Sequence, residues 1–201
     1  MPTPLHPAPA SDTDPPVLVA GGPFTAVELQ AMEHDGVLRR LIADAYVPVQ
    51  CREAPELRAR GLAAILAPRL VHRTVVGRLT AAWVYGCAGT PDTPVLLVDG
   101  SRRMSTLRAT HRLLVHEVYF GPFDIVKLAG VRVTSPLRTA VDLAIHSEDG
   151  VSVPVLRRML AQPRLGLTVG LVARGLDALP RQPHLARARR VIARVAGAPA
   201  S

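Results

Sequence analysis

Residues 133–144 carry the strongest structural signal in this chain, and they run Val-Thr-Ser-Pro-Leu-Arg-Thr-Ala-Val-Asp-Leu-Ala. Ser135 followed by Pro136 is typical of a helix start, because serine caps free amides and proline is tolerated in the first turn. From Leu137, apolar residues recur every three or four positions up to Ile145 and form one stripe. The segment therefore predicts a short strand over residues 131–133, followed by a helix that buries this stripe.

The opposite face of this expected helix is polar and carries Arg138, Thr139, Asp142 and His146. Arg138 and Asp142 are four residues apart, so their side chains can meet on one helix face. The simplest interpretation is an exposed ion pair that contributes a few tenths of a kcal/mol. The alternative is a polar face that is offered to a partner.

Outward from this helix, the pattern alternates between short strands and helices. Strands are expected at residues 45–49, 71–76, 94–98, 113–120 and 124–126, and helices at 55–67, 77–85, 154–161, 168–179 and 183–195. Apolar residues make up 48% of the chain but aromatic residues only 3%, so the core must be aliphatic. We expect an α+β fold, with a small mixed or antiparallel sheet packed by helices and a helical C-terminal segment.

The N-terminal part begins differently, with seven prolines in residues 1–23. This density predicts a disordered leader. Thr25 and Glu28 then have the spacing of a capping box, and Asp35-Gly36 ends the helix that they start. The expected divisions are the leader (1–23), a helix and hairpin (24–50), an α+β domain (51–150) and basic C-terminal helices (151–201).

The charge is concentrated at the C-terminal end of a chain whose formal net charge is +8. Residues 151–201 hold nine arginines and one carboxylate, whereas residues 1–50 hold six carboxylates and two arginines. The expected last helix places Arg187, Arg190 and Arg194 on one side with Arg189 beside them, and such a face can contact phosphates. Two alternatives remain: a solvated outer face, and a coding bias towards arginine, since Lys127 is the one lysine.

The sequence offers no catalytic constellation. Glycine-rich phosphate loops, metal-binding His or Cys spacings and nucleophile motifs are absent, and the spacing of Asp124 and Lys127 does not match a nuclease. Cys51 and Cys87 are expected to be reduced thiols. With neither a signal peptide nor an apolar run of about 18 residues, we expect a cytoplasmic protein without a cofactor, a metal, a membrane partner or a small-molecule substrate.

Residues 133–144 also resemble a motif of the AbiEi-type antitoxins, which belong to type IV toxin–antitoxin (abortive infection) systems. Thr134, Pro136, Arg138, Thr139 and Asp142 carry the match. Residues 79–86, Leu-Thr-Ala-Ala-Trp-Val-Tyr-Gly, are similar to a small-residue helix of that family, and the resemblance spans about residues 24–146. It implies a regulator encoded beside a nucleotidyltransferase-type toxin, with an N-terminal winged helix that binds operator DNA and a C-terminal domain for antitoxicity.

Two features depart from that family pattern. Residues 24–50 have room for one helix and a hairpin, a truncated winged helix, and the region is net negative. Candidate DNA contacts are Arg39 and Arg40 on the wing and, more strongly, Arg187, Arg189, Arg190 and Arg194. We expect an antitoxin-like or transcriptional-regulator-like protein and no enzyme. The alternatives are a protein-interaction module without DNA affinity and, more remotely, a degenerate nuclease-related protein.

Overall fold

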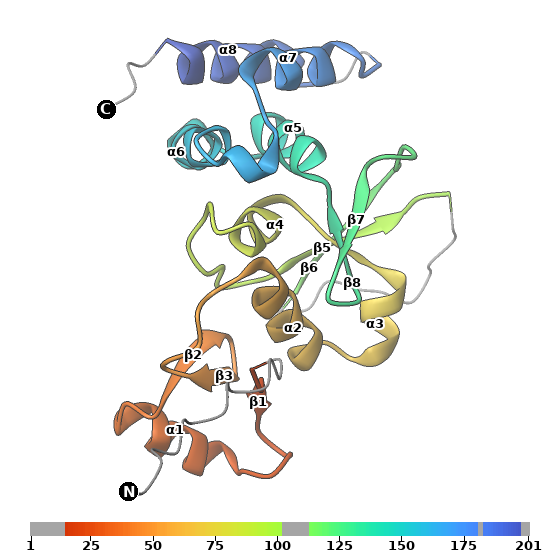
Figure 1. Ribbon diagram of the computed structural model, residues 1–201. Coiled ribbons are helices and arrows are strands. Elements are labelled where there is room, and N and C mark those ends of the chain that lie inside the picture. Colours follow the sequence, from red (N-terminus) through yellow and green to blue (C-terminus); the bar gives the residue numbers. More distant parts are fainter. Residues whose placement is uncertain (1–14, 102–112, 181–182, 198–201) are drawn as a thin grey trace, which may run out of the picture.

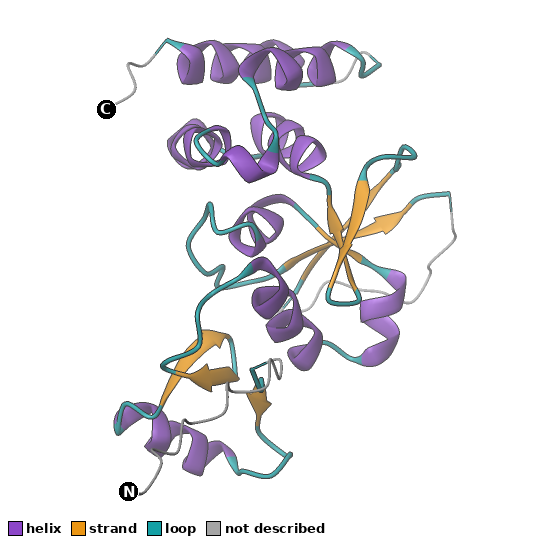
Figure 2. Ribbon diagram, in the orientation of Figure 1, coloured by secondary structure: helices purple, strands orange, loops and turns teal. Residues whose placement is uncertain are grey.

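The computed structural model describes residues 15–101, 113–180 and 183–197 (Figure 1). The described residues form eight α-helices, a three-stranded antiparallel sheet and a five-stranded mixed sheet (Figure 2). The expected fold class, a small sheet packed by helices, is therefore confirmed. The larger core is mainly aliphatic, with Trp83 and Tyr85 as buried aromatic side chains, and it contains residues from Leu41 to Val195.

A small N-terminal unit combines β1 (Leu18–Val19), α1 (Ala26–His34), β2 (Leu38–Ile42) and β3 (Ala45–Pro48). Its sheet has the order β1-β3-β2, and α1 covers it through Leu29, which packs with Leu38 and Tyr46. The predicted capping box is present. The backbone amide of Glu28 donates to the hydroxyl of Thr25, and the backbone amide of Thr25 donates to the carboxylate of Glu28. This unit is one helix and three strands, attached to the rest through α2 (Pro55–Ile65).

The prediction of a disordered leader is wrong for residues 15–23. Leu18 and Val19 pair with Tyr46 and Ala45 as the edge strand of the small sheet. The prolines at positions 15 and 16 precede this strand without interrupting it, so proline density over the whole segment concealed a short apolar run. The rest of the expected leader, residues 1–14, lies outside the described residues.

The five-stranded sheet has the order β6-β5-β4-β8-β7 and consists of β4 (Val75–Val76), β5 (Val95–Asp99), β6 (Leu114–Val118), β7 (Ile125–Leu128) and β8 (Val131–Thr134). β4 runs parallel to β8 and β5 parallel to β6, while the other two pairs are antiparallel. Ala129 and Gly130 both have positive φ in the tight turn between β7 and β8. β8 leads directly into the helix at Ser135-Pro136.

Residues 71–76 do not form the expected strand. A helix, α3 (Pro68–Arg73), takes up the first half, and only Val75 and Val76 pair as β4. Pro68 starts this helix. The β-branched residues in 71–76 suggested a strand, but so short a segment does not distinguish a strand from a helix. The next helix, α4 (Arg78–Val84), is where it was expected.

Four helices stack at the end of the molecule opposite the N-terminal unit (Figure 1): α5 (Pro136–His146), α6 (Asp149–Leu160), α7 (Val169–Asp177) and α8 (Leu185–Ala196). A 3-10 turn (Pro163–Leu165) precedes α7. α6 starts five residues earlier than expected, because Pro154 lies inside the helix and does not open it. α5 packs against α4, α6, α7 and α8, so it joins this helical layer to the sheet domain.

Candidate functional site

Residues 134–142 form a partly buried network of contacts at the junction of β8 and α5. Ser135 caps α5 by accepting the amide of Arg138 at 3.3 Å, and Pro136 occupies the first helical position. The hydroxyls of Thr134 and Thr139 lie 2.7 Å apart, and both side chains are fully buried. Thr134 and Thr139 therefore fix the direction in which α5 leaves the sheet.

Arg138 is the centre of a second set of contacts. Its Nε donates to Asp142 at 2.9 Å, and its Nη1 donates to Asp124 and to the carbonyl of Tyr119, the latter at 3.0 Å. The guanidinium also lies 5.5 Å from the ring centroid of Phe120. Arg138 thus ties α5 to the turn between β6 and β7.

This geometry corrects the expected exposed ion pair. Asp142 is only 4% exposed, Thr139 is fully buried, and the guanidinium of Arg138 is mostly enclosed. The part of the polar face around Arg138 and Asp142 is enclosed because the turn over residues 119–124 folds against Arg138, whereas His146 at the end of the helix is exposed. The predicted ion pair between Arg138 and Asp142 is present, but the prediction that it is exposed is wrong.

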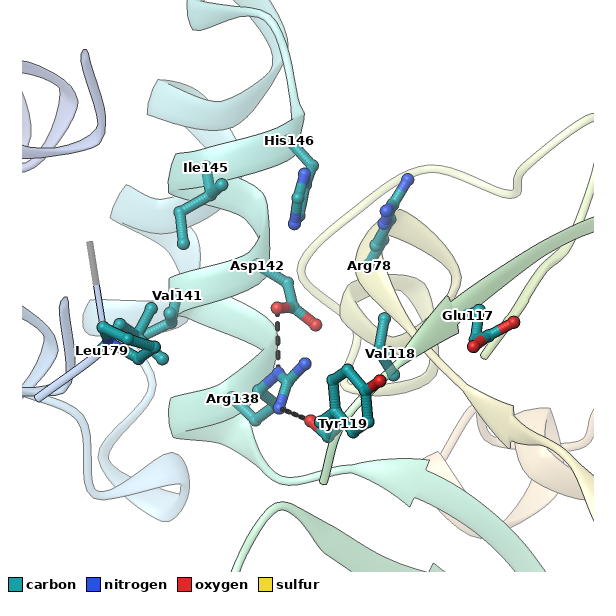
Figure 3. Close-up of a pocket in the computed structure, with 11 residues that line it drawn as sticks. Arg78, Glu117, Val118, Tyr119, Arg138, Val141, Asp142, Ile145, His146 and Leu179 are labelled. Carbon is teal, nitrogen blue, oxygen red and sulfur yellow. Dashed lines mark hydrogen bonds and ion pairs between the residues drawn. The ribbon is translucent and has the colours of Figure 1, made fainter. Parts of the chain in front are cut away.

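A cleft of about 370 Å³ opens beside this network (Figure 3). It lies between α5, β6 and the start of α4, and its polar lining residues are Arg78, Glu117, Tyr119, Arg138, Asp142 and His146. One carboxylate oxygen of Asp142 is held by Arg138, whereas Oδ2 is buried without a hydrogen-bond partner among the described residues. Burial raises the pKa of Asp142, and Arg138 and Arg78 partly oppose that shift.

The expected wing arginines are engaged within the fold. Arg39 donates to Glu53 at 2.8 Å and to the carbonyl of Cys51 at 3.0 Å. Arg40 forms an ion pair with Glu33 at 3.0 Å and packs its guanidinium over the ring of Tyr46. Both side chains therefore hold the N-terminal unit together.

The arginines of α8, of which Arg187, Arg190 and Arg194 were expected on one outer side with Arg189 beside them, have three different environments. Arg187 is half-buried and points inward, where it donates to the carbonyls of Ile145 and Ser147 at the end of α5. Arg189 and Arg194 are exposed but paired with Asp177 and Asp149 at 2.9 Å and 2.6 Å. Arg190 is exposed and has no bonding partner in the described part of the chain. Arg187 is therefore not part of the exposed basic face of α8.

Three further arginines have a structural role that the sequence did not signal. Arg58, Arg158 and Arg164 donate to the carbonyls of Trp83, Cys87 and Tyr85, all at the C-terminal end of α4. Helix C-termini leave carbonyls unpaired and attract cations. Much of the arginine content therefore stabilises the fold and is not available to an external polyanion.

Among the described residues, no group of three or more His, Cys, Asp or Glu side chains is placed to hold a metal ion. Cys51 and Cys87 are both free thiols, and Cys87 is buried. None of the described helices combines the length and the apolar character that crossing a membrane requires.

Comparisons with known proteins identify no family for this chain, and a solved structure is similar to it. No protein-family model and no curated protein matches the chain. The structure is similar to the crystal structure of the RV2827C protein from Mycobacterium tuberculosis, with a TM-score of 0.41 and 14% identity. The alignment covers 87% of this chain and 65% of the neighbour, so this chain spans somewhat less than two thirds of that protein's length.

Proposed function

We propose that this chain is an antitoxin-like regulatory protein of a type IV toxin–antitoxin pair, which acts by binding other macromolecules. The observation that carries the proposal is the opposite charge of its two ends. In the N-terminal unit, Glu28, Glu33, Asp35 and Asp44 outnumber two arginines that are already paired. At the far end (Figure 1), α8 exposes Arg189, Arg190 and Arg194.

The basic end is the proposed site for operator DNA. Arg190 is free to contact a phosphate, and the ion pairs of Arg189 and Arg194 are exposed. Exposed ion pairs contribute about 0–1 kcal/mol, so a phosphate can replace Asp177 or Asp149 at little cost. The wing arginines of the family pattern are less suited, because Arg39 is largely enclosed by its partners.

The acidic end is the proposed site for the toxin. Val27, Val37 and Val49 are exposed on this unit, and the carboxylates of Glu28, Asp35 and Asp44 are exposed near them in the chain. Exposed apolar side chains and exposed carboxylates on the same unit fit a protein partner with a basic face. A nucleotidyltransferase-type toxin, which handles polyphosphate substrates, would present such a face.

A mobility-shift assay on the chain's own promoter tests the DNA half of the proposal. Replacing Arg189, Arg190 and Arg194 by Gln should weaken binding and reduce its salt dependence. The matched control replaces Arg52, Arg69 and Arg73, three exposed arginines of the sheet domain, with the same loss of charge. Equal weakening by both triple variants would show that net charge alone acts, and α8 would no longer be the site.

Co-purification with the product of the neighbouring gene tests the toxin half. Val27→Lys adds a charge of the wrong sign and removes apolar surface, so it should abolish the complex. Val151→Lys makes the same change at an exposed valine on α6 and should leave the complex intact. A complex that still forms with Val27→Lys would show that the N-terminal unit is not the toxin site.

The second candidate is a protein-interaction module without DNA affinity. It is favoured by one observation: Arg39, Arg40, Arg189 and Arg194 all hold carboxylates of the chain itself. The absence of any promoter shift at low salt, together with a stable toxin complex, would favour this module over the regulator.

A further inference from the structure

The cleft beside the motif has features that the proposed function does not use. Its volume of about 370 Å³ lies within the range of about 300–1,000 Å³ that is usual for small-molecule sites. It is lined by two guanidiniums, two carboxylates, an imidazole and an aromatic ring (Figure 3). Charged groups of both signs in one hollow indicate a ligand with both donors and acceptors.

Asp142 provides the first unfilled hydrogen-bonding position. The side chain is 4% exposed and lines the cleft, yet its Oδ2 has no partner among the described residues. A buried polar atom without a partner is costly, and native structures contain few of them. Figure 3 shows one oxygen of Asp142 directed at Arg138 and the other directed away from it. A donor group of a ligand would satisfy this second oxygen.

Arg78 provides the second unfilled position, on the other side of the cleft. Its Nε is buried without a partner among the described residues, and burial lowers the pKa of the guanidinium. Its φ of +52° lies in the left-handed region, which costs a non-glycine residue free energy and is common at functional sites. The cleft is thus lined by the guanidinium of Arg78, which can only donate, and by an oxygen of Asp142 that can accept.

Tyr119 provides an aromatic surface at the same cleft. Its ring is 74% exposed, and its backbone carbonyl is fixed by Arg138. Phe123, in the same turn, is 88% exposed but does not line the cleft. Exposed aromatic side chains beside cationic groups are typical of surfaces on which unpaired bases stack.

We propose that this cleft binds a single nucleobase, with the base between Arg78 and Asp142 and the base plane on Tyr119. Nucleobases carry donors and acceptors on more than one edge, so a base in the cleft can offer a donor to Asp142 and an acceptor to Arg78. A peptide amide also offers both groups, but it does not use the exposed ring. The base can come from a free nucleoside or nucleotide, or from an unstacked position in a single strand.

Titration with guanosine, adenosine, cytidine and uridine, followed by calorimetry, tests this proposal without phosphate contacts. We expect saturable binding of at least one nucleoside, weakened about tenfold by Tyr119→Ala and by Asp142→Asn. The matched control is Phe123→Ala, which removes an exposed ring outside the cleft and should leave binding unchanged. Because nucleosides carry no phosphate, failure here would not affect the proposal for α8.

A labelled single strand of about ten nucleotides, at high salt, identifies the source of the base. Binding of the strand that is tighter than that of the nucleoside, with the same loss in Tyr119→Ala, supports an unstacked base in a strand; equal affinity supports a free nucleoside or nucleotide. The proposal is overturned if no nucleoside binds in the millimolar range, if Phe123→Ala weakens binding as much as Tyr119→Ala, or if Tyr119→Ala instead disrupts only the toxin complex.

Discussion

The phenol of Tyr85 donates a hydrogen bond of 2.7 Å to the backbone carbonyl of Thr134, 49 residues later in the chain. Tyr85 ends α4 and Thr134 ends β8, so this bond joins the two segments that carry the family resemblance. The bond is fully buried, and burial raises the pKa of Tyr85 well above its ordinary value. The two segments are thus parts of one buried junction.

Tyr85→Phe should lower the free energy of unfolding by about 1 kcal/mol, the net contribution of one buried hydrogen bond. The loss should not be larger, because Thr139 also donates to the carbonyl of Thr134, at 3.2 Å. Urea denaturation measures the change. The control is Tyr119→Phe, which removes a phenol from an exposed ring and should leave stability unchanged; an equal loss in both variants would contradict the assignment.

Arg138→Gln should be far more damaging, at about 3 kcal/mol, because it leaves the buried carboxylate of Asp142 without its guanidinium. Adding Asp142→Asn should recover part of that loss, since an amide costs less to bury than an unpaired charge. Chemical denaturation of the two single variants and the double variant gives the coupling free energy. Additive losses would mean that the two side chains do not act as a pair.

Sequence reasoning succeeded where the determinants are local. The Thr25–Glu28 capping box and the Ser135-Pro136 helix start were predicted and are present, because each depends on residues within one turn. The helix that ends at Arg73 was missed because residues 71–76, Val-His-Arg-Thr-Val-Val, are too short a segment to distinguish a helix from a strand. The edge strand at Leu18 was missed because its partner, Tyr46, is distant in the chain.

The site was less predictable for the same reason. The spacing of Arg138 and Asp142 is identical in an exposed and a buried pair, and only the distant carbonyl of Tyr119 and carboxylate of Asp124 enclose it. Arg187 is in phase with Arg190 and Arg194, yet it turns inward because the end of α5 presents free carbonyls. Helical periodicity gives the face of a residue but not its tertiary partner.

His146, at the end of α5, should titrate at an unusually low pH. Desolvation and the positive charges of Arg78, His116, Arg138 and His184 lower the pKa of His146 to about 4. NMR titration of the imidazole measures it directly, with His146→Gln to assign the signal. Arg78→Gln should raise the titration midpoint of His146. A midpoint near 6.5 that does not change in Arg78→Gln would contradict this prediction.

The same shift predicts acid sensitivity of the fold. Because the folded pKa of His146 lies below the unfolded value of about 6.5, the unfolded chain binds more protons between these values. The stabilisation is therefore present above pH 6.5 and is lost as the pH falls towards 4. His146→Gln should lose less stability than the unaltered chain over this window, as measured by denaturation at each pH.

Arg187 and Arg190 form a matched pair, since they lie one turn apart on α8 and lose the same charge when changed to Gln. Arg187→Gln should lower the free energy of unfolding by about 1–2 kcal/mol, because the carbonyls of Ile145 and Ser147 lose their donor. Arg190→Gln should change stability by no more than about 0.5 kcal/mol, since the exposed side chain has no partner in the described part of the chain.

Promoter affinity should show the reverse order for these two variants. Arg190→Gln removes a phosphate contact and should reduce the salt slope of binding by about one, whereas Arg187→Gln should leave that slope unchanged. Mobility shifts at several salt concentrations, paired with the two denaturation curves, separate the two roles. If Arg187→Gln flattened the salt slope without affecting stability, the inward contacts at the end of α5 would not be what holds this side chain.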